Sequence, residues 1–221
     1  MIRRARDRGP AALPSGRSGL PSLVPSLVPW PGRPRRGKAF RVLILGGARS
    51  GKSVTAERLL SRQDDVDYVA TGPLPDAADP DWAARVRLHQ QRRPAHWTTL
   101  ETLELEDALA GPGLTPARLA VPVLVDCLST WLAGVMEEAG LWAADPGADK
   151  KLAERVDGLV DAWRSTRRHV VAVSNEVGSG VVPATVSGLR FRDELGVLNA
   201  RIAADCEQVW LCTAGIARRL R

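Results

Sequence analysis

A glycine-rich segment near residue 50 constrains the fold of this chain more than any other feature. Its eight residues match the pattern G-x-x-x-x-G-K-[ST]: Gly46, Gly47, Ala48, Arg49, Ser50, Gly51, Lys52 and Ser53. An apolar run over residues 41–45 precedes it, and residues 53–62 favour a helix. A loop placed between a buried strand and a helix surrounds phosphates with backbone N–H groups. The segment therefore predicts a nucleoside triphosphate site, in which Lys52 reaches the β- and γ-phosphates and the Ser53 hydroxyl binds Mg²⁺.

Short β-branched runs alternate with helical stretches along most of the chain. We expect strands at 41–45, 66–70, 121–125, 169–174 and 208–213, and helices at 53–62, 81–91, 151–168 and 191–205. This alternation predicts a mostly parallel sheet covered by helices on both faces. The expected fold class is therefore α/β, of the phosphate-loop nucleotide-binding type. Trp131, Trp163 and Trp210 stand in apolar patterns and are expected in the core.

Residues 1–39 differ in composition from the rest of the chain. They contain seven of the 16 prolines, and residues 1–40 hold nine of the 31 Lys and Arg but a single acidic residue. Because prolines at this density prevent helix and sheet, we expect a disordered basic extension. A signal peptide and a basic arm for nucleic acid are the alternatives, but prolines interrupt the apolar run and aromatic residues are absent apart from Trp30. The other 22 basic and 24 acidic residues leave one domain, residues 40–221, close to neutral.

The cysteine positions and the hydropathy of the chain argue against several classes of protein. Cys127, Cys206 and Cys212 form no C-x-x-C pair and no cluster with histidine, which argues against a disulfide framework and a structural zinc site. No run approaches the roughly 18 apolar residues that cross a bilayer. We therefore expect a protein of the reducing cytoplasm, with no membrane span and no nucleic-acid partner.

Asp126 directly follows the apolar run at 121–125. The carboxyl ends of parallel strands meet at one edge of a sheet, where a carboxylate opposite Ser53 completes a magnesium site. Asp126 also precedes the helix-favouring stretch CLSTWLAG, so a helix N-cap is the alternative, and the two roles are compatible. We expect Asp126 to be the second magnesium ligand.

Two of the three histidines stand in the segment RLHQQRRPAHW, which contains His89, Arg92, Arg93 and His96. A neutral imidazole attacks phosphorus and holds a phosphoryl or nucleotidyl group covalently, and nearby arginines stabilise phosphate charge. Spacing alone favours the alternative, in which these are surface residues of a basic helix.

The segment SNEVGSGVVP begins at residue 174. Asn175 and Glu176 follow an apolar strand, where ligands gather in α/β sheets. Its glycines and Pro183 equally describe an ordinary turn, and the charges at 190–194 equally describe a solvated helix face with internal ion pairs. A substrate or subunit contact and a plain structural role are both open.

Five segments together resemble one enzyme family. They are LILGGARSGKSVTAE, YVATG, RLHQQRRPAHW, VLVDCLSTWL and VSNEVGSGVVPATVSGLRFRDELGVLNARIAADCEQVWL. In this order, from about Arg41 to Arg221, the chain resembles the bifunctional adenosylcobinamide kinase / adenosylcobinamide-phosphate guanylyltransferases of cobalamin biosynthesis. The resemblance implies that the γ-phosphate of ATP or GTP is transferred to a hydroxyl of adenosylcobinamide, a corrinoid. It further implies that GMP is transferred from GTP, through an enzyme histidine, to adenosylcobinamide phosphate, giving adenosylcobinamide-GDP.

The resemblance also implies the roles of single residues. It makes His89 the guanylylated histidine, whereas His96 matches a later, unmodified histidine. It implies further nucleotide contacts at Ala70, Thr71, Gly72, Gln90, Gln91, Arg92, Arg93, Glu101 and Asp126. Leu88, Gln90 and Gln91 depart from the pattern, since relatives can carry His, Lys and Asp there. A homo-oligomer, a trimer, is implied as well.

Two competing functions are open at this point. One is a different small-molecule kinase with the same loop, in which His89 is only a helix residue. The other is a nucleic-acid-binding ATPase that uses the basic N-terminal segment.

Overall fold

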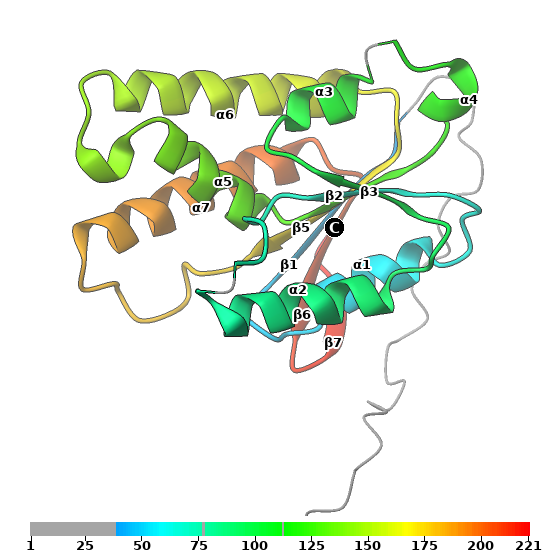
Figure 1. The fold of residues 1–221 in the computed structure, drawn as a ribbon, viewed down its shortest axis with the longest axis horizontal. Coiled ribbons are helices and arrows are strands. Elements are labelled where there is room, and N and C mark those ends of the chain that lie inside the picture. Colours follow the sequence, from blue (N-terminus) through cyan, green and yellow to red (C-terminus); the bar gives the residue numbers. More distant parts are fainter. Residues whose placement is uncertain (1–38, 77, 112) are drawn as a thin grey trace, which may run out of the picture.

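The structure, a computed structural model, describes residues 39–76, 78–111 and 113–221. The expected extension, residues 1–39, lies outside this part except for Ala39, which is buried. Seven strands form one sheet in the order β3-β2-β4-β5-β1-β6-β7 (Figure 1). The strands are β1 (Arg41–Gly46), β2 (Asp67–Ala70), β3 (Thr98–Glu101), β4 (Val123–Asp126), β5 (Val170–Asn175), β6 (Gln208–Thr213) and β7 (Ile216–Arg219). Every neighbouring pair is parallel except β6 with β7, so the prediction of a mostly parallel sheet is confirmed.

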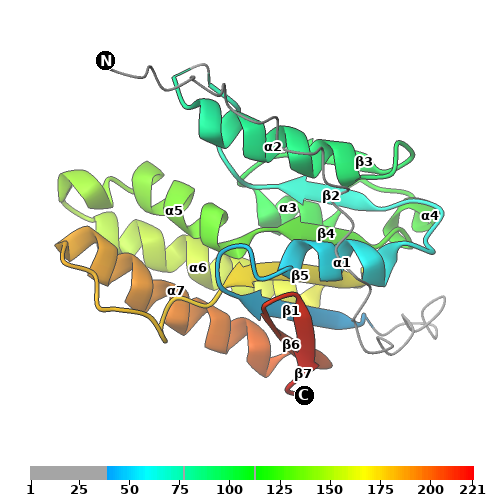
Figure 2. The same ribbon diagram turned by 90° about the horizontal axis from the view of Figure 1, so that it is seen from below.

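Helices cover both faces of this sheet. They are α1 (Lys52–Leu60), α2 (Pro80–Arg92), α3 (Leu105–Ala110), α4 (Pro116–Leu119), α5 (Leu128–Glu138), α6 (Ala148–Ser165) and α7 (Val186–Ala204), with a 3-10 turn η1 (Leu141–Ala143). Helices α3, α5, α6 and α7 lie on one face, and α1 and α2 lie on the other (Figures 1 and 2).

The core has two parts, one on each face. Leu43 of β1 packs in the cluster that contains Trp131 and Trp163. Its neighbour Ile44 packs in the cluster that contains Trp210, because successive side chains of a strand point to opposite faces. The three tryptophans are 0%, 0% and 5% exposed, in chain order, so their predicted place in the core is confirmed.

Helix α7 begins earlier than the sequence pattern predicts. The expected helix spans 191–205, whereas α7 starts at Val186. The Thr185 side chain accepts a hydrogen bond from the Gly188 N–H and so caps the first turn. The apolar residues of the extra turn, Val186 and Leu189, are exposed, so this turn does not belong to the buried face of the helix.

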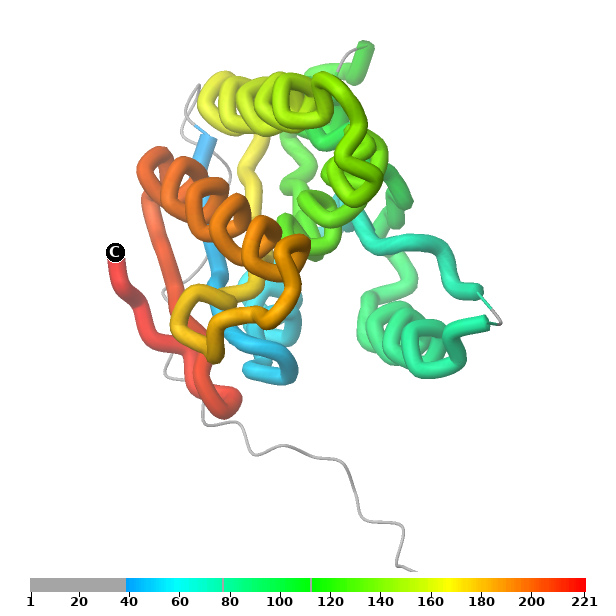
Figure 3. Tube along the Cα trace, turned by 90° about the vertical axis from the view of Figure 1, so that its left-hand side faces the viewer, coloured from blue at the N-terminus to red at the C-terminus, as the bar shows by residue number. Residues whose placement is uncertain are grey.

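Helix α2 is only loosely packed on the body of the molecule. Among the described residues of α2, Ala83 alone is buried. Viewed from the left-hand side of Figure 1, α2 stands apart from α5, α6 and α7 (Figure 3).

In the described part of the chain no helix combines the length and apolarity needed to cross a membrane.

Candidate active site

The predicted phosphate loop joins β1 to α1. Two of its glycines are required by geometry. A Cβ on Gly46 would lie 2.6 Å from the carbonyl oxygen of Cys212 on β6, and Gly51, at the N-cap of α1, has a φ of 92° that side chains disfavour. Nζ of Lys52 donates to the carbonyl of Gly47 at 3.1 Å, so the ammonium group lies over the loop that is expected to hold phosphate.

The turn between β6 and β7 supports this loop. The N–H of Gly215 donates to the carbonyl of Ser50 at 3.0 Å. A Cβ on Gly51 would lie 3.3 Å from Cα of Gly215, so the two backbones are in close contact. Nothing in the glycine-rich pattern itself indicated this support.

Asp126 ends β4 and faces the first turn of α1. Oγ of Ser53 donates to Oδ1 of Asp126 at 3.3 Å. The alternative role of Asp126 as a helix N-cap is wrong, because Cys127 occupies the N-cap of α5. A hydroxyl and a carboxylate at this separation are hard oxygen donors of the kind that Mg²⁺ prefers, so the residues present fit the predicted ion.

His89 lies near the end of α2 and faces the same carboxylate. Its Nδ1 is 3.4 Å from Oδ2 of Asp126, and 26% of its side chain is exposed. The hydroxyl of Tyr68, on β2, donates to the same Oδ2 at 2.6 Å. The structure thus brings Ser53, His89 and Asp126 together from three segments distant in the sequence.

The environment keeps Asp126 charged and Tyr68 protonated. Burial alone would raise the pKa of Asp126, but hydrogen bonds with His89, Tyr68 and Ser53 outweigh it and lower that pKa below the ordinary aspartate value. Burial and the charge of Asp126 raise the pKa of Tyr68 well above its ordinary value. Asp126 is therefore an anionic acceptor, and Tyr68 is a stable donor.

Arg92 and Arg93 anchor the end of α2 to two different elements. Arg92 forms a bidentate ion pair with Glu57 of α1, with distances of 3.1 Å to Oε2 and 3.0 Å to Oε1. The guanidinium carbon of Arg93 lies 3.5 Å from the ring centroid of Tyr68. Nε of Arg93 is buried without a hydrogen-bond partner in the described structure.

Two residues of this site were missed at the level of sequence. Ligand atoms of Glu57, His89 and Asp126 lie within 4.8 Å of one another, and Tyr68 contacts Asp126 directly. Glu57 stands four residues after Ser53, hence on the same helix face, and this spacing could have indicated it. Tyr68 gave no such signal, because its contact depends on how β2 and β4 pair.

Ala70 and Glu101 form a row with Asp126 across the carboxyl ends of three neighbouring strands. In the sheet register Ala70 pairs with both Glu101 and Asp126. Thr71 follows Ala70 and is buried, with Oγ1 donating to the Cys127 carbonyl at 2.6 Å, and a Cβ on Gly72 would lie 2.5 Å from the Trp82 ring. Gln90, Gln91 and His96 are exposed.

The segment after β5 borders the phosphate loop. The N–H of Glu176 donates to the carbonyl of Gly46 at 3.1 Å. Internal pairing of the α7 charges holds for Arg190 and Glu194, at 2.8 Å. It does not hold for Arg192, which donates to the Gly178 carbonyl at 3.1 Å and so ties α7 to this segment.

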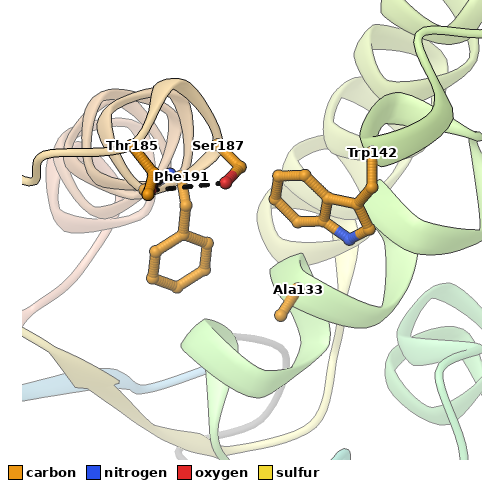
Figure 4. A pocket seen from close by; sticks show the side chains of 6 residues that line it. Ala133, Trp142, Thr185, Ser187 and Phe191 are labelled. Carbon is orange, nitrogen blue, oxygen red and sulfur yellow. Dashed lines mark hydrogen bonds between the residues drawn. The ribbon is translucent and has the colours of Figure 1, made fainter.

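An apolar pocket of about 330 Å³ lies where the start of α7 faces α5 and η1 (Figure 4). Its lining residues are Ala133, Trp142, Thr185, Ser187, Gly188 and Phe191. The rings of Trp142 and Phe191 form its walls.

A phosphate loop on a parallel sheet, with a carboxylate at the end of a nearby strand, defines a P-loop nucleoside-triphosphate-binding protein. A solved ATPase from the type III secretion system of pathogenic bacteria shares this fold, with a TM-score of 0.50 and 12% sequence identity over 79% of this chain and 51% of the ATPase. The chain thus covers about half of that ATPase, and the likeness concerns the fold alone.

The chain belongs to the cobinamide kinase / cobinamide phosphate guanyltransferase family, whose model matches residues 42–220. It is 39% identical over 183 residues to the bifunctional adenosylcobalamin biosynthesis protein CobP of Pseudomonas aeruginosa, covering 82% of this chain and 98% of that protein. It is 33% identical over 186 residues to the corresponding protein CobU of Escherichia coli K12, covering 81% and 99%. The resemblance seen in the sequence is confirmed, and the chain is a transferase of cobalamin biosynthesis.

Proposed function

We propose that this chain phosphorylates adenosylcobinamide with ATP or GTP and then transfers GMP from GTP to the product through a covalent bond to His89. The observation that carries the proposal is the position of His89. Its Nδ1 lies 3.4 Å from Asp126, whose other oxygen lies 3.3 Å from Ser53 of the phosphate loop. A nucleophile and a phosphate cradle therefore belong to one site.

The contact with Asp126 selects the reacting nitrogen of His89. A carboxylate opposite Nδ1 favours the tautomer with its proton on Nδ1, which leaves the lone pair on Nε2. Nε2 attacks the α-phosphorus of GTP, a P–N bond forms, and the bond from this phosphorus to the bridging oxygen breaks, so pyrophosphate leaves. A phosphate oxygen of adenosylcobinamide phosphate then attacks the same phosphorus, and the P–N bond breaks. Two displacements replace one difficult step.

Phosphorylation uses the same loop without the histidine. The oxygen of the corrinoid hydroxyl attacks the γ-phosphorus and loses its proton to water. The bond from this phosphorus to the bridging oxygen breaks, so the nucleoside diphosphate leaves. The loop N–H groups and Lys52 hold the triphosphate and stabilise its charge. Ser53 and Asp126 would hold Mg²⁺, which when bound neutralises phosphate charge.

The remaining expected contacts complete the nucleotide site in this proposal. They are Ala70 at the end of β2 with Thr71 and Gly72 after it, Gln90 to Arg93 at the end of α2, and Glu101 at the end of β3. Ala70, Glu101 and Asp126 lie in a row across the strand ends, which supports the proposal that the nucleotide lies there. The implied homotrimer belongs to the proposal too, and light scattering tests it.

Labelling with α-³²P-GTP tests the covalent step. We expect an acid-labile, base-stable label on the wild type, no label on His89→Ala, and normal labelling of His96→Ala, the matched control. Phosphorylation by His89→Ala should be normal, and Lys52→Ala should impair both reactions. An unlabelled wild type would favour an ordinary P-loop kinase, and equal loss of both reactions in a folded His89→Ala protein would contradict the division of labour.

A further inference from the structure

Tyr68 is a buried aromatic residue that contacts both halves of the active site. Its side chain is 1% exposed. Its hydroxyl donates to Oδ2 of Asp126 at 2.6 Å, and the guanidinium of Arg93 lies over its ring at 3.5 Å from the centroid. Asp126 ends β4, and Arg93 is the C-cap of α2. One side chain therefore joins the sheet to the helix that carries His89.

The position of the C-terminal end of α2, which carries His89, depends on polar contacts because apolar packing does not fix it. Ala83, the buried residue of α2 in the described structure, lies near the opposite end of the helix. The His89 end is held by the pair of Arg92 with Glu57 and the contact of His89 with Asp126. Arg93 also stacks on Tyr68 and donates a hydrogen bond to Oγ1 of Thr99 at 3.3 Å. A change in any of these contacts alters the distance between His89 and the phosphate loop.

The hydroxyl of Tyr68 also fixes the orientation of the Asp126 carboxylate. Ser53 contacts Oδ1, whereas Tyr68 and His89 share Oδ2. Without the Tyr68 donor, Ser53 still holds Oδ1, but Oδ2 loses its short hydrogen bond, so the direction of its 3.4 Å contact with His89 is less well fixed. A reacting group displaced by about 1 Å reacts on the order of a hundredfold more slowly.

We propose that Tyr68 is a positioning residue for guanylyl transfer, which aligns His89 by holding Asp126 through its hydroxyl and Arg93 through its ring. This inference rests on the proposed function of His89. In the proposed function phosphorylation does not use His89, and the contact of Ser53 with Oδ1 of Asp126 does not involve Tyr68. The effect of Tyr68 therefore falls mainly on guanylyl transfer.

Two substitutions separate the two contacts. Tyr68→Phe removes the hydroxyl and keeps the ring beneath Arg93, whereas Tyr68→Leu removes both. Single-turnover labelling with α-³²P-GTP, at a series of GTP concentrations, gives a maximal rate and a half-saturating concentration for each variant. For Tyr68→Phe we expect the maximal rate to fall about tenfold while the half-saturating concentration and the phosphorylation rate change less than about threefold. For Tyr68→Leu we expect a larger fall and a raised half-saturating concentration, because Arg93 loses its stacking on the ring and keeps only its hydrogen bond to Thr99.

The control is Trp210→Phe, which alters a buried aromatic residue of the same core cluster away from Asp126 and Arg93. It should lower the melting temperature without changing the ratio of the two rates. If Tyr68→Phe is labelled at the rate of the wild type, or if both reactions slow equally, the role of Tyr68 is overturned. Neither result contradicts guanylylation of His89. An unlabelled wild type overturns both proposals.

Discussion

Nδ1 of His89 lies 3.4 Å from Oδ2 of Asp126, at the point where α2 meets the end of β4. The other oxygen of this carboxylate, Oδ1, accepts a hydrogen bond from Ser53 at 3.3 Å. One carboxylate thus faces both the phosphate loop and the histidine. In the proposed function, this arrangement lets both reactions use a single phosphate-binding site.

Replacement of Asp126 by Asn should impair both reactions. The amide keeps the size of the side chain but loses the charge that suits a magnesium ion and the Nδ1–H of His89. We expect both rates to fall on the order of a hundredfold, measured at saturating nucleotide over a range of Mg²⁺ concentrations. Full phosphorylation together with lost labelling would show that Asp126 serves the histidine alone.

Replacement of Glu57 by Gln should slow guanylyl transfer more than phosphorylation, because it breaks the bidentate pair that ties α1 to the end of α2. The Arg92 side chain is 37% exposed, so the free energy of unfolding should fall by less than about 1 kcal/mol. Both rates and urea unfolding curves check this. Glu154→Gln, in an exposed pair with Lys150, is the control and should change neither rate. An unchanged guanylylation rate in Glu57→Gln would contradict the anchoring role.

Replacement of Asp67 by Ala should destabilise the fold strongly. Asp67 accepts hydrogen bonds from Arg118 and from Arg168, and Arg168 is 1% exposed. Without Asp67 the guanidinium of Arg168 stays buried with no counter-charge, which costs about 3 to 5 kcal/mol. Asp65→Ala removes only a partly exposed partner of Arg118 and should cost less than about 1 kcal/mol. Denaturant unfolding measures both values. If the free energy of unfolding fell equally in Asp67→Ala and Asp65→Ala, the special role of the buried pair would be contradicted.

The stability of the wild type should fall as the pH drops below about 6.5. Burial lowers the pKa of His169, whose Nδ1 accepts the Phe40 N–H at 2.8 Å. Between the folded and the unfolded pKa the unfolded chain binds more protons, so acid favours unfolding in this window. His169→Asn keeps an acceptor but does not titrate. Its unfolding midpoint should therefore depend less on pH between about 6.5 and 5 than that of the wild type, and identical pH dependences would refute this account.

Local patterns in the sequence predicted the elements that carry their own signal. The phosphate loop has fixed residues, and β1, β5 and β6 are apolar runs, so their places were predictable. The four residues of β3 are all exposed and show no alternation, and β7 contains two arginines, so neither strand stood out. These strands exist because they pair with a neighbour, which is a tertiary effect.

The candidate site was predictable in its residues but not in its contacts. Asp126 was expected opposite Ser53 because the carboxyl ends of parallel strands meet at one edge of a sheet. The role of His89 was implied by family resemblance alone. The approach of His89 to Asp126 requires α2 to pack against α1 and β2 through Arg92 and Arg93, contacts that link residues 35 and 25 positions apart. Periodicity within one helix carries no information about such contacts.

Peptide mapping of the wild type after incubation with GTP shows whether His89 carries the GMP. Trypsin cleaves after Arg87 and Arg92, so His89 and His96 fall in different peptides. Tandem mass spectrometry under neutral to basic conditions, which preserve a phosphoramidate, should find GMP on the peptide Leu88 to Arg92. A GMP adduct confined to the peptide with His96, or none on either peptide while the corrinoid still becomes guanylylated, would contradict the account.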